Sequence, residues 1–367
     1  MKKLCLALLL LCVGVLPLHA ESKKTENLKF VDATTLNLGG HTMQTEKSPY
    51  FRFDCEPYKF DVKNIIRYSR YSSGLYVTFK TTSSQVWATW ENVSRQVSDN
   101  MTPIFQLGMD LYIKDKGEWV FCAVGRISTD PAKNCRTRSL IANLPKGEKE
   151  FLLYLPCWAE VTKLEIGVDK DAVIEPLLNP FRHKVVVYGS SITHGASASR
   201  PGMTYPARMS RNVGIDFINF GFSGQCKMQP QFLEFLVKCE ADAFVFDCFA
   251  NPTADEIAER VENFVTKMVE AHPGKPMIFL RSFHNEDEFY DLKHKAAFAK
   301  KIAVTRDKMA VLTKKYKDVY YFDYEYATGR DCNSTIDTSH PNDLGFDRVI
   351  NTYQPKIVKT LKKYGIK

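Results

Sequence analysis

The chain lacks the features of several classes of protein. Beyond residue 20, no segment is apolar over the roughly 20 residues that a membrane-spanning helix needs, so stable membrane insertion of the mature chain is not expected. The formal net charge is +8, but charges of both signs are interspersed and no basic cluster marks a nucleic-acid partner. There is no internal repeat and no low-complexity linker. What remains is a globular composition, and 367 residues are enough for two domains of ordinary size.

Metal-ligand patterns are also missing. The ten cysteines are irregularly spaced, with no Cys-x-x-Cys pair and no accompanying histidines, which argues against a zinc site. His194, His284 and His294 lack partners at ligand spacing, so we interpret them as rim or surface residues and expect neither a metal nor another cofactor. Most cysteines are expected to be buried thiols. Two pairs are the first to test for a disulfide: Cys122 with Cys135, and Cys226 with Cys239.

The N-terminus has the pattern of a secretory signal peptide. Two lysines precede an apolar run from Leu4 to Leu18, and Ala20 stands just before a polar segment. The run is too short for an ordinary membrane anchor. We therefore expect residues 1–20 to be removed by cleavage after Ala20, and the mature protein to be exported to a periplasm or out of the cell.

Residues 21–175 predict an all-β, jelly-roll-like sandwich domain. Short runs rich in β-branched and aromatic residues alternate with turn residues, without convincing helical periodicity. The expected strands are Gly74–Lys80, Gln85–Trp90, Met109–Ile113, Trp119–Val124 and Phe151–Leu155. Lys114–Gly117 predicts a hairpin turn between the third and fourth strands. Four tryptophans are expected mainly to pack in the core, with a sugar-stacking platform as the alternative: Trp87, Trp90, Trp119 and Trp158.

Residues 176–367 alternate between strand-like and helical segments. The expected strands are Val185–Tyr188, Asp216–Phe220, Ala243–Phe249, Met277–Leu280 and Val319–Phe322. The clearest helix begins at a capping box made by Thr253 and Glu256, and a second long helix is expected over Ala296–Tyr316. Such alternation predicts right-handed β-α-β units and a three-layer, flavodoxin-like α/β domain whose parallel sheet is covered on both faces. The proline-containing segment Ile174–Arg182 is the expected domain boundary.

The first candidate for chemistry is a strand that ends in small hydroxylated residues. Val185–Tyr188 is followed by Gly189, Ser190 and Ser191. Ligands of open parallel sheets bind beyond the carboxyl ends of the strands, where these serines would lie. A serine hydroxyl becomes a nucleophile when a histidine, steered by a carboxylate, accepts its proton. From the residues alone, either serine could be that nucleophile, and an ordinary turn is the alternative.

Suitable partners follow other strands of the same predicted sheet. Asp337 and His340 stand three residues apart in a proline-containing loop after the last strand, so their side chains can hydrogen-bond to each other. Gly224 follows the second strand and could offer its backbone N–H to an oxyanion, while Asn251 follows the third and could offer its side-chain amide. Each has an alternative role as a turn or cap residue. Because the candidates follow four different strands, coincidence is the weaker explanation.

These motifs resemble those of the SGNH hydrolases, also called GDSL-like esterases and lipases. Gly189-Ser190-Ser191 resembles the first block of that family, with serine at position 190 in place of the usual aspartate. Gly224 and Asn251 resemble the second and third blocks, and Asp337-Thr338-Ser339-His340-Pro341 matches the fifth. The stretch Tyr188–Arg200 is further similar to a subgroup in which this domain follows a β-sandwich, as in secreted carbohydrate acetylesterases.

The resemblance implies a serine esterase that acts through an acyl-enzyme and uses no cofactor. Ser191 would be the nucleophile, His340 the general base and then acid, and Asp337 the orienting carboxylate. The backbone N–H groups of Ser191 and Gly224 and the Asn251 amide would form the oxyanion hole. The residues just before Asn251 depart from the glycine-rich form of the family. A conventional α/β-hydrolase is disfavoured because the elbow Gly-x-Ser-x-Gly is missing.

The implied substrate is a small ester or an acetylated glycan, and above all an O-acetyl group on a carbohydrate. A lipase or phospholipid acylhydrolase is the first alternative, but no amphipathic lid or large apolar insertion supports it. The second alternative is a non-catalytic glycan-binding protein that retains the hydrolase scaffold. The complete set of Ser191, Asn251, Asp337 and His340 argues against that alternative.

Overall fold

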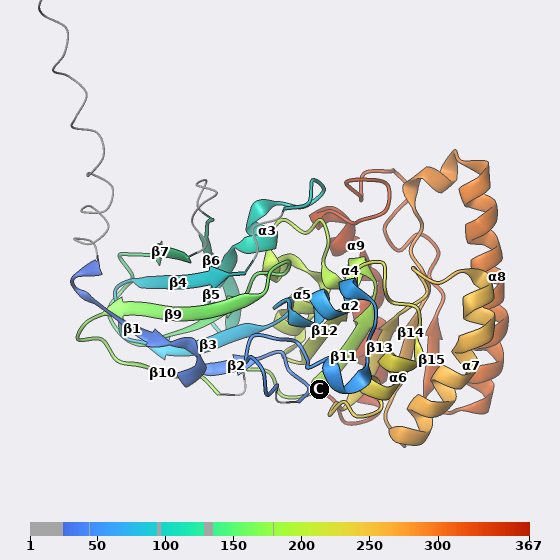
Figure 1. Cartoon of the computed structure of the whole chain (residues 1–367), viewed down its shortest axis with the longest axis horizontal. Coiled ribbons are helices and arrows are strands. Elements are labelled where there is room, and N and C mark those ends of the chain that lie inside the picture. Colours follow the sequence, from blue (N-terminus) through green and yellow to red (C-terminus); the bar gives the residue numbers. More distant parts are fainter. Residues whose placement is uncertain (1–24, 44, 94–96, 128–134, 179) are drawn as a thin grey trace, which may run out of the picture.

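The structure is a computed structural model that describes residues 25–43, 45–93, 97–127, 135–178 and 180–367. The expected signal peptide therefore lies outside the described residues. Two units follow one another along the chain (Figure 1), which we call the sandwich unit, residues 25–178, and the α/β unit, residues 180–367. Within the described ranges, no helix is both long and apolar enough to cross a membrane.

The sandwich unit consists of two antiparallel sheets. The first has the order β1 (Leu28–Asp32), β9 (Val161–Asp169), β4 (Val86–Asn92) and β7 (Cys135–Ile141). The second has the order β10 (Ile174–Pro176), β3 (Tyr76–Thr81), β8 (Lys149–Tyr154), β5 (Met109–Asp115) and β6 (Glu118–Gly125), with β2 (Asn37–Gly39) paired to β3. Side chains from both sheets, such as Phe79, Trp90, Leu153 and Ile166, share one buried core. The predicted sandwich is therefore confirmed.

The predicted hairpin and strands of this unit are present. β5 and β6 pair with Asp115 opposite Glu118, which leaves Lys116 and Gly117 as a two-residue turn. Both turn residues have positive φ, of 49° and 88°, as a tight hairpin of this kind requires. Five strands were not predicted: β1, β2, β7, β9 and β10. β2 and β10 are only three residues long, and β7 contains two arginines, whereas β1 and β9 contain apolar residues and were missed.

The parallel sheet of the α/β unit has the predicted strands. Its order is β12 (Asp216–Gly221), β11 (Lys184–Gly189), β13 (Ala243–Asp247), β14 (Met277–Leu280) and β15 (Val319–Phe322). Each strand alternates between the two faces: Val186 and Tyr188 belong to one buried cluster, and Val185 and Val187 to the other. Because both clusters are covered by helices, the strands are apolar throughout, which is why the sequence pattern predicts them well.

Helices cover both faces of this sheet, as Figure 1 shows. α4 (Ser191–His194), α5 (Tyr205–Val213) and α9 (Asp343–Lys362) pack on one face, and α6 (Pro230–Leu236), α7 (Ala254–Ala271) and α8 (Leu292–Lys315) on the other. The predicted capping box of Thr253 and Glu256 is present at the start of α7. The second predicted helix, α8, begins earlier than expected because the Asp291 side chain caps its first turn.

Part of the sandwich unit packs on the parallel sheet instead, so the prediction of an all-β N-terminal half is wrong there. α2 (Lys63–Arg70) and the preceding aromatic residues join the core on the α6 and α7 face, where the Phe53 and Phe235 rings lie 4.3 Å apart. The buried Arg52 guanidinium donates to the Gly221 carbonyl at 2.7 Å. A second short helix, α3 (Pro103–Leu107), lies between β4 and β5. Helices this short carry too few turns for their periodicity to be recognised.

The two candidate disulfides are also corrected. Cys122, Cys226 and Cys239 are free thiols. The Cys122 thiol donates to the Leu111 carbonyl at 3.4 Å, and the Cys239 thiol to the Phe235 carbonyl at 3.6 Å. These local hydrogen bonds occupy both thiols inside the core, where burial also raises their pKa to about 12 and keeps them protonated.

The tryptophans do not form one platform. Trp90 is fully buried in the sandwich core, as expected. Trp87 lies on β4 and Trp119 on β6, which belong to different sheets. Trp158 packs instead against the His194 ring, with centroids 4.3 Å apart.

Candidate active site

The structure brings Ser191, His340 and Asp337 together. Ser191 Oγ lies 2.9 Å from His340 Nε2, and His340 Nδ1 lies 2.8 Å from Asp337 Oδ2. The His340 and Asp337 side chains keep 22% and 32% of their surface exposed. A continuous line of hydrogen bonds therefore runs from the serine hydroxyl through the imidazole to the carboxylate, and solvent reaches it. This is the geometry in which a histidine can take a proton from serine while a carboxylate orients the ring.

The structure also separates the two serines that the residue pattern leaves open. Ser190 Oγ accepts the backbone N–H of Ile192 at 3.2 Å and caps the N-terminus of α4. Ser191 is the first residue of α4, and its hydroxyl faces His340. Ser190 thus serves the turn that carries Ser191. Serine and aspartate are both good N-caps, so an aspartate at position 190 could make the same contact.

Two glycines allow the Ser191 turn to lie directly on the sheet. A Cβ atom on Gly189 would come within 1.9 Å of Thr193 Oγ1, and one on Gly221 within 1.9 Å of the His194 backbone nitrogen. Side chains at either position would push α4 away from β11 and β12. The glycine at the end of the first strand is therefore required by close packing, beyond its role in the turn.

The oxyanion-hole candidates follow strands that end level with β11. Gly189 pairs with Gly221 of β12 and with Asp247 of β13, so the loops that carry Gly224 and Asn251 leave the same edge of the sheet. Asn251 Oδ1 accepts the backbone N–H of Cys226 at 3.1 Å, and this contact orients the amide with Nδ2 as its remaining donor group. Gly224 has a φ of 68°, which favours glycine at this turn.

A buried carboxyl group forms a hydrogen bond with α4, the helix that begins at Ser191. Asp247 ends β13 and has no exposed surface, and its Oδ2 accepts the Thr193 hydroxyl at 2.9 Å. The Tyr205 hydroxyl lies 2.8 Å from the same threonine oxygen. Burial raises the pKa of Asp247 to about 7. This cluster holds α4 against the sheet, and the residue pattern did not indicate it.

Asn100 is the site residue that sequence reasoning missed. Its Nδ2 donates to Asp337 Oδ2 at 2.8 Å, although the two residues are 237 positions apart. Burial raises the pKa of Asp337, but the hydrogen bonds from the Asn100 side chain, the His340 backbone and the His340 ring lower it to about 2. No local signal could have found this contact, because Asn100 follows β4 of the sandwich unit and precedes α3.

The three histidines for which the sequence predicts no ligand role differ in their burial. His194 is fully buried, which corrects its interpretation as a rim residue, and its Nε2 lies 2.9 Å from the Cys157 carbonyl oxygen. Burial lowers the pKa of His194 well below the ordinary value. His284 and His294 are partly exposed and lie 2.9 Å and 3.0 Å from carboxylate oxygens of Glu288 and Asp287. In the described part of the chain, no three His, Cys, Asp or Glu residues are placed to hold a metal ion.

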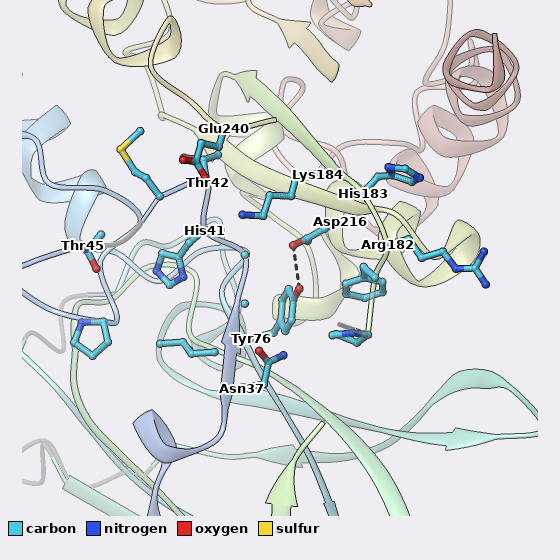
Figure 2. Close-up of a pocket in the computed structure, with 17 residues that line it drawn as sticks. Asn37, His41, Thr42, Thr45, Tyr76, Arg182, His183, Lys184, Asp216 and Glu240 are labelled. Atoms are coloured by element: carbon cyan, nitrogen blue, oxygen red, sulfur yellow. Dashed lines mark hydrogen bonds between the residues drawn. The ribbon is translucent and has the colours of Figure 1, made fainter. Parts of the chain in front are cut away.

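A large cavity of about 680 Å³ lies at the opposite end of the parallel sheet (Figure 2). Lys184 and Asp216, the first residues of β11 and β12, line it together with His41 and Tyr76. The Tyr76 hydroxyl donates to Asp216 Oδ2 at 2.9 Å and so joins the sandwich unit to the sheet. Since this cavity adjoins the amino ends of the strands, it is separate from the triad at the carboxyl ends.

Two family models match successive parts of the chain. Residues 182–358 match the GDSL-like lipase/acylhydrolase family, and residues 28–174 match GxDLY, the N-terminal domain of SGNH-hydrolase-type esterases. No protein in the comparison with curated proteins matches.

Several solved structures share the fold. A Bacteroides ovatus protein classed as a GDSL-like lipase is 39% identical, with 92% of this chain and 98% of that chain covered and a TM-score of 0.88. A salicylyl-acyltransferase from a tetracycline biosynthetic pathway is 19% identical, with 91% and 98% covered and a TM-score of 0.71. An acetyl xylan esterase from the rumen bacterium Butyrivibrio proteoclasticus is 13% identical, with 92% and 98% covered and a TM-score of 0.53.

The last two similarities concern the fold alone, whereas the first extends over nearly the whole of both chains at substantial identity. Together with the two matched models, it shows that the chain belongs to the GDSL-like lipase/acylhydrolase family, in the form that carries an N-terminal GxDLY domain.

Proposed function

We propose that this protein is a serine esterase that removes O-acetyl groups from a carbohydrate through an acyl-enzyme. The observation that carries the catalytic part is the line of hydrogen bonds from Ser191 through His340 to Asp337. Membership of the family supports an esterase or acylhydrolase. We further propose that the acyl group is acetyl and that the alcohol is a carbohydrate.

In the first half-reaction, His340 Nε2 takes the proton of the Ser191 hydroxyl as Oγ attacks the ester carbonyl carbon. The carbonyl oxygen becomes an oxyanion, which accepts hydrogen bonds from the backbone N–H groups of Ser191 and Gly224 and from Asn251 Nδ2. As the bond to the alcohol breaks, His340 gives its proton to the leaving oxygen. Asp337 remains ionised throughout, accepting the Nδ1–H bond that orients the imidazolium.

In the second half-reaction, water replaces the alcohol. His340 takes a proton from the water as its oxygen attacks the acyl carbon on Ser191, and a second oxyanion forms in the same place. When this intermediate collapses, His340 returns the proton to Ser191 Oγ and the carboxylic acid is released. Asp337 can stay ionised because the hydrogen bonds around it hold its pKa at about 2, despite the opposing effect of burial.

Three observations support an acetylated carbohydrate as the substrate. The fold is shared with an acetyl xylan esterase over most of both chains. The pattern of residues 1–20 favours export, and exported esterases meet polysaccharides. In addition, the line from Ser191 to Asp337 lies in an accessible place, since the Asp337 carboxylate keeps 32% of its surface exposed. A bulky glycan can approach such a site, whereas a long acyl chain would need an apolar channel to bury it.

The direct test combines a substrate series with Ser191→Ala. We expect the wild-type protein to hydrolyse acetyl esters of an activated phenol faster than octanoyl esters, and to release acetate from acetylated xylan, pectin or host-type glycans. Ser191→Ala should lower kcat by a factor of about 10⁴ or more with an unchanged melting temperature. Ser84→Ala, at an exposed serine of the sandwich unit, is the matched control and should keep wild-type turnover.

Two results would contradict the proposal. Full turnover by Ser191→Ala would refute the assignment of the nucleophile. A preference for octanoyl over acetyl esters, without acetate release from any glycan, would favour the lipase alternative.

A further inference from the structure

The catalytic carboxylate receives a hydrogen bond from outside its own loop. Asp337 Oδ1 accepts the backbone N–H groups of Ser339 and His340 at 3.3 Å and 2.8 Å, and Oδ2 accepts the His340 ring at 2.8 Å. These three donors belong to the same turn as Asp337. The fourth is Asn100 Nδ2 of the sandwich unit, 2.8 Å from Oδ2. Asn100 Nδ2 also lies 3.5 Å from His340 Nδ1, so two N–H donors converge on one oxygen.

We propose that Asn100 is a positioning residue of the active site, through which the sandwich unit sets the orientation of Asp337 and the basicity of the carboxylate toward His340. The inference rests on the proposed serine esterase mechanism. It adds a residue and a role for the sandwich unit that the family motifs do not include.

The Asp337 loop gains from such a contact because it is partly exposed and contains a residue in a strained conformation. The Asp337 side chain is 32% exposed, so water competes for its oxygens. Thr338, the next residue, has a φ of 69°, a region that a β-branched residue rarely adopts. A donor fixed from outside the loop replaces a mobile water and holds Oδ2 at the position where it meets His340 Nδ1.

Asn100 can act as a fixed donor because its own segment is tied to the loop after the nucleophile. The Asn100 carbonyl accepts the Ser197 hydroxyl at 2.8 Å, and the Thr102 hydroxyl donates to the Ser199 carbonyl at 2.7 Å. Thr102 Oγ1 also accepts the backbone N–H of Phe105 and caps α3. The segment 100–102 therefore bridges the loop that follows Ser191 and the loop that carries Asp337.

The electrostatic effect has a definite direction. An N–H donor on Oδ2 stabilises the ionised carboxylate and contributes, against the effect of burial, to the low pKa of Asp337. It also shares Oδ2 with the His340 Nδ1–H group, so the carboxylate stabilises the imidazolium less strongly. Loss of Asn100 should thus leave a carboxylate that is more mobile and more basic. The first change lowers kcat, and the second moves the acidic limb of the pH profile to higher pH.

The experiment compares Asn100→Ala and Asn100→Asp with Val97→Ala in the full-length protein. Val97 is an exposed residue of the same segment and should behave as wild type. For hydrolysis of the activated acetyl ester, we expect Asn100→Ala to lower kcat about tenfold, as for loss of a hydrogen bond to a charged group, with KM within about twofold. Asn100→Asp keeps the size but places a second carboxylate against Asp337, so kcat should fall further and the acidic limb should move further up.

A double-mutant cycle separates positioning from general support of the fold. If Asn100 acts through Asp337, Asn100→Ala should cause almost no further loss of kcat in an Asp337→Ala background. A tenfold loss that persists in that background would overturn the inference. So would wild-type kcat and an unchanged pH profile in Asn100→Ala. If Asn100→Ala does not fold, Asn100→Asp in the otherwise wild-type protein decides instead, since wild-type kcat and an unchanged acidic limb in that variant would overturn the inference, and its melting temperature reports any structural cost.

The failure of this inference differs from the failure of the proposed function. If Ser191→Ala abolishes turnover but Asn100→Ala and Asn100→Asp behave as wild type, only the role of Asn100 is refuted. If Ser191→Ala keeps full turnover, the mechanism fails and the inference fails with it.

Discussion

The two adjacent serines should respond to alanine substitution in different ways. Ser190 is 1% exposed, and its hydroxyl satisfies the Ile192 backbone N–H at the start of α4. In Ser190→Ala that N–H loses its partner inside the protein, because Ile192 is itself only 5% exposed. An N-cap of this kind contributes about 1 kcal/mol, and an unsatisfied buried donor costs about 1–3 kcal/mol. We therefore expect the free energy of unfolding to fall by about 1–2 kcal/mol.

The effect on catalysis follows from the length of α4. This helix is one turn long, and Gly195, with a φ of 102°, caps its C-terminus, so loss of the N-terminal cap affects the whole helix. Ser191 is its first residue, and loosening the turn misplaces Oγ relative to His340. We expect kcat to fall about tenfold in Ser190→Ala, against about 10⁴-fold or more in Ser191→Ala. Ser190→Asp should restore the cap and keep kcat near wild type.

Urea unfolding and steady-state hydrolysis of the activated acetyl ester measure both effects. A Ser190→Ala variant as inactive as Ser191→Ala would refute the division of roles between the two serines. Unchanged stability together with unchanged kcat would instead show that the Ser190 cap contributes nothing.

Two further predictions concern the carboxyl groups of Asp337 and Asp216. Asp337→Ala should lower kcat by about 10⁴-fold and His340→Ala by about 10⁶-fold, because Asp337 orients the ring while His340 transfers the proton; equal losses in ester hydrolysis would contradict this order. Burial raises the pKa of Asp216 to about 6, above the unfolded value near 3.9, so the folded state holds this proton more tightly and stability falls as the pH rises from about 4 to 6. Asp216→Asn removes this loss, so its unfolding free energy at pH 7 minus that at pH 4 should exceed the wild-type value by up to about 3 kcal/mol. Equal pH dependence of the variant and the wild type in urea unfolding would refute this.

The parallel sheet and its loops were predictable because their signals are local. Each strand of the sheet is a short apolar run buried on both faces, and β11 shows this most clearly with Val185, Val186 and Val187. Polar residues directly after these strands could be assigned to one edge of the sheet without knowing any distance. The same reasoning brought Asp337 and His340 to the edge that carries the serines, but it could not choose between Ser190 and Ser191. That choice needed either the family pattern or the direction of two hydroxyl groups.

Contacts between the units could not be predicted in this way. Nothing in the sequence around Arg52 indicates that it is buried, yet it is 1% exposed and donates to Gly221 of β12. Phe53 belongs by position to the sandwich unit, but it packs against Phe235 of α6. Neither position has a periodic pattern that reveals its partner, because the partner lies more than a hundred residues away. Hydrophobic periodicity indicates which residues are buried but does not identify the residues that cover them.

Asn100 extends this point from packing to chemistry. A sandwich appended to a hydrolase suggests a separate module that binds substrate, and such a module could be removed without disturbing the triad. Here the Asn100 amide of the sandwich unit lies 2.8 Å from Asp337 Oδ2, the proposed orienting carboxylate, and Arg52 of the same unit donates to Gly221 at the end of β12, which precedes the loop with Gly224. Without the sandwich unit, the α/β unit would lose the hydrogen bonds that Asn100 and Arg52 donate to it. The sandwich unit thus contributes contacts to the candidate active site, and on the proposed mechanism substitutions at these contacts should lower kcat more than they change KM.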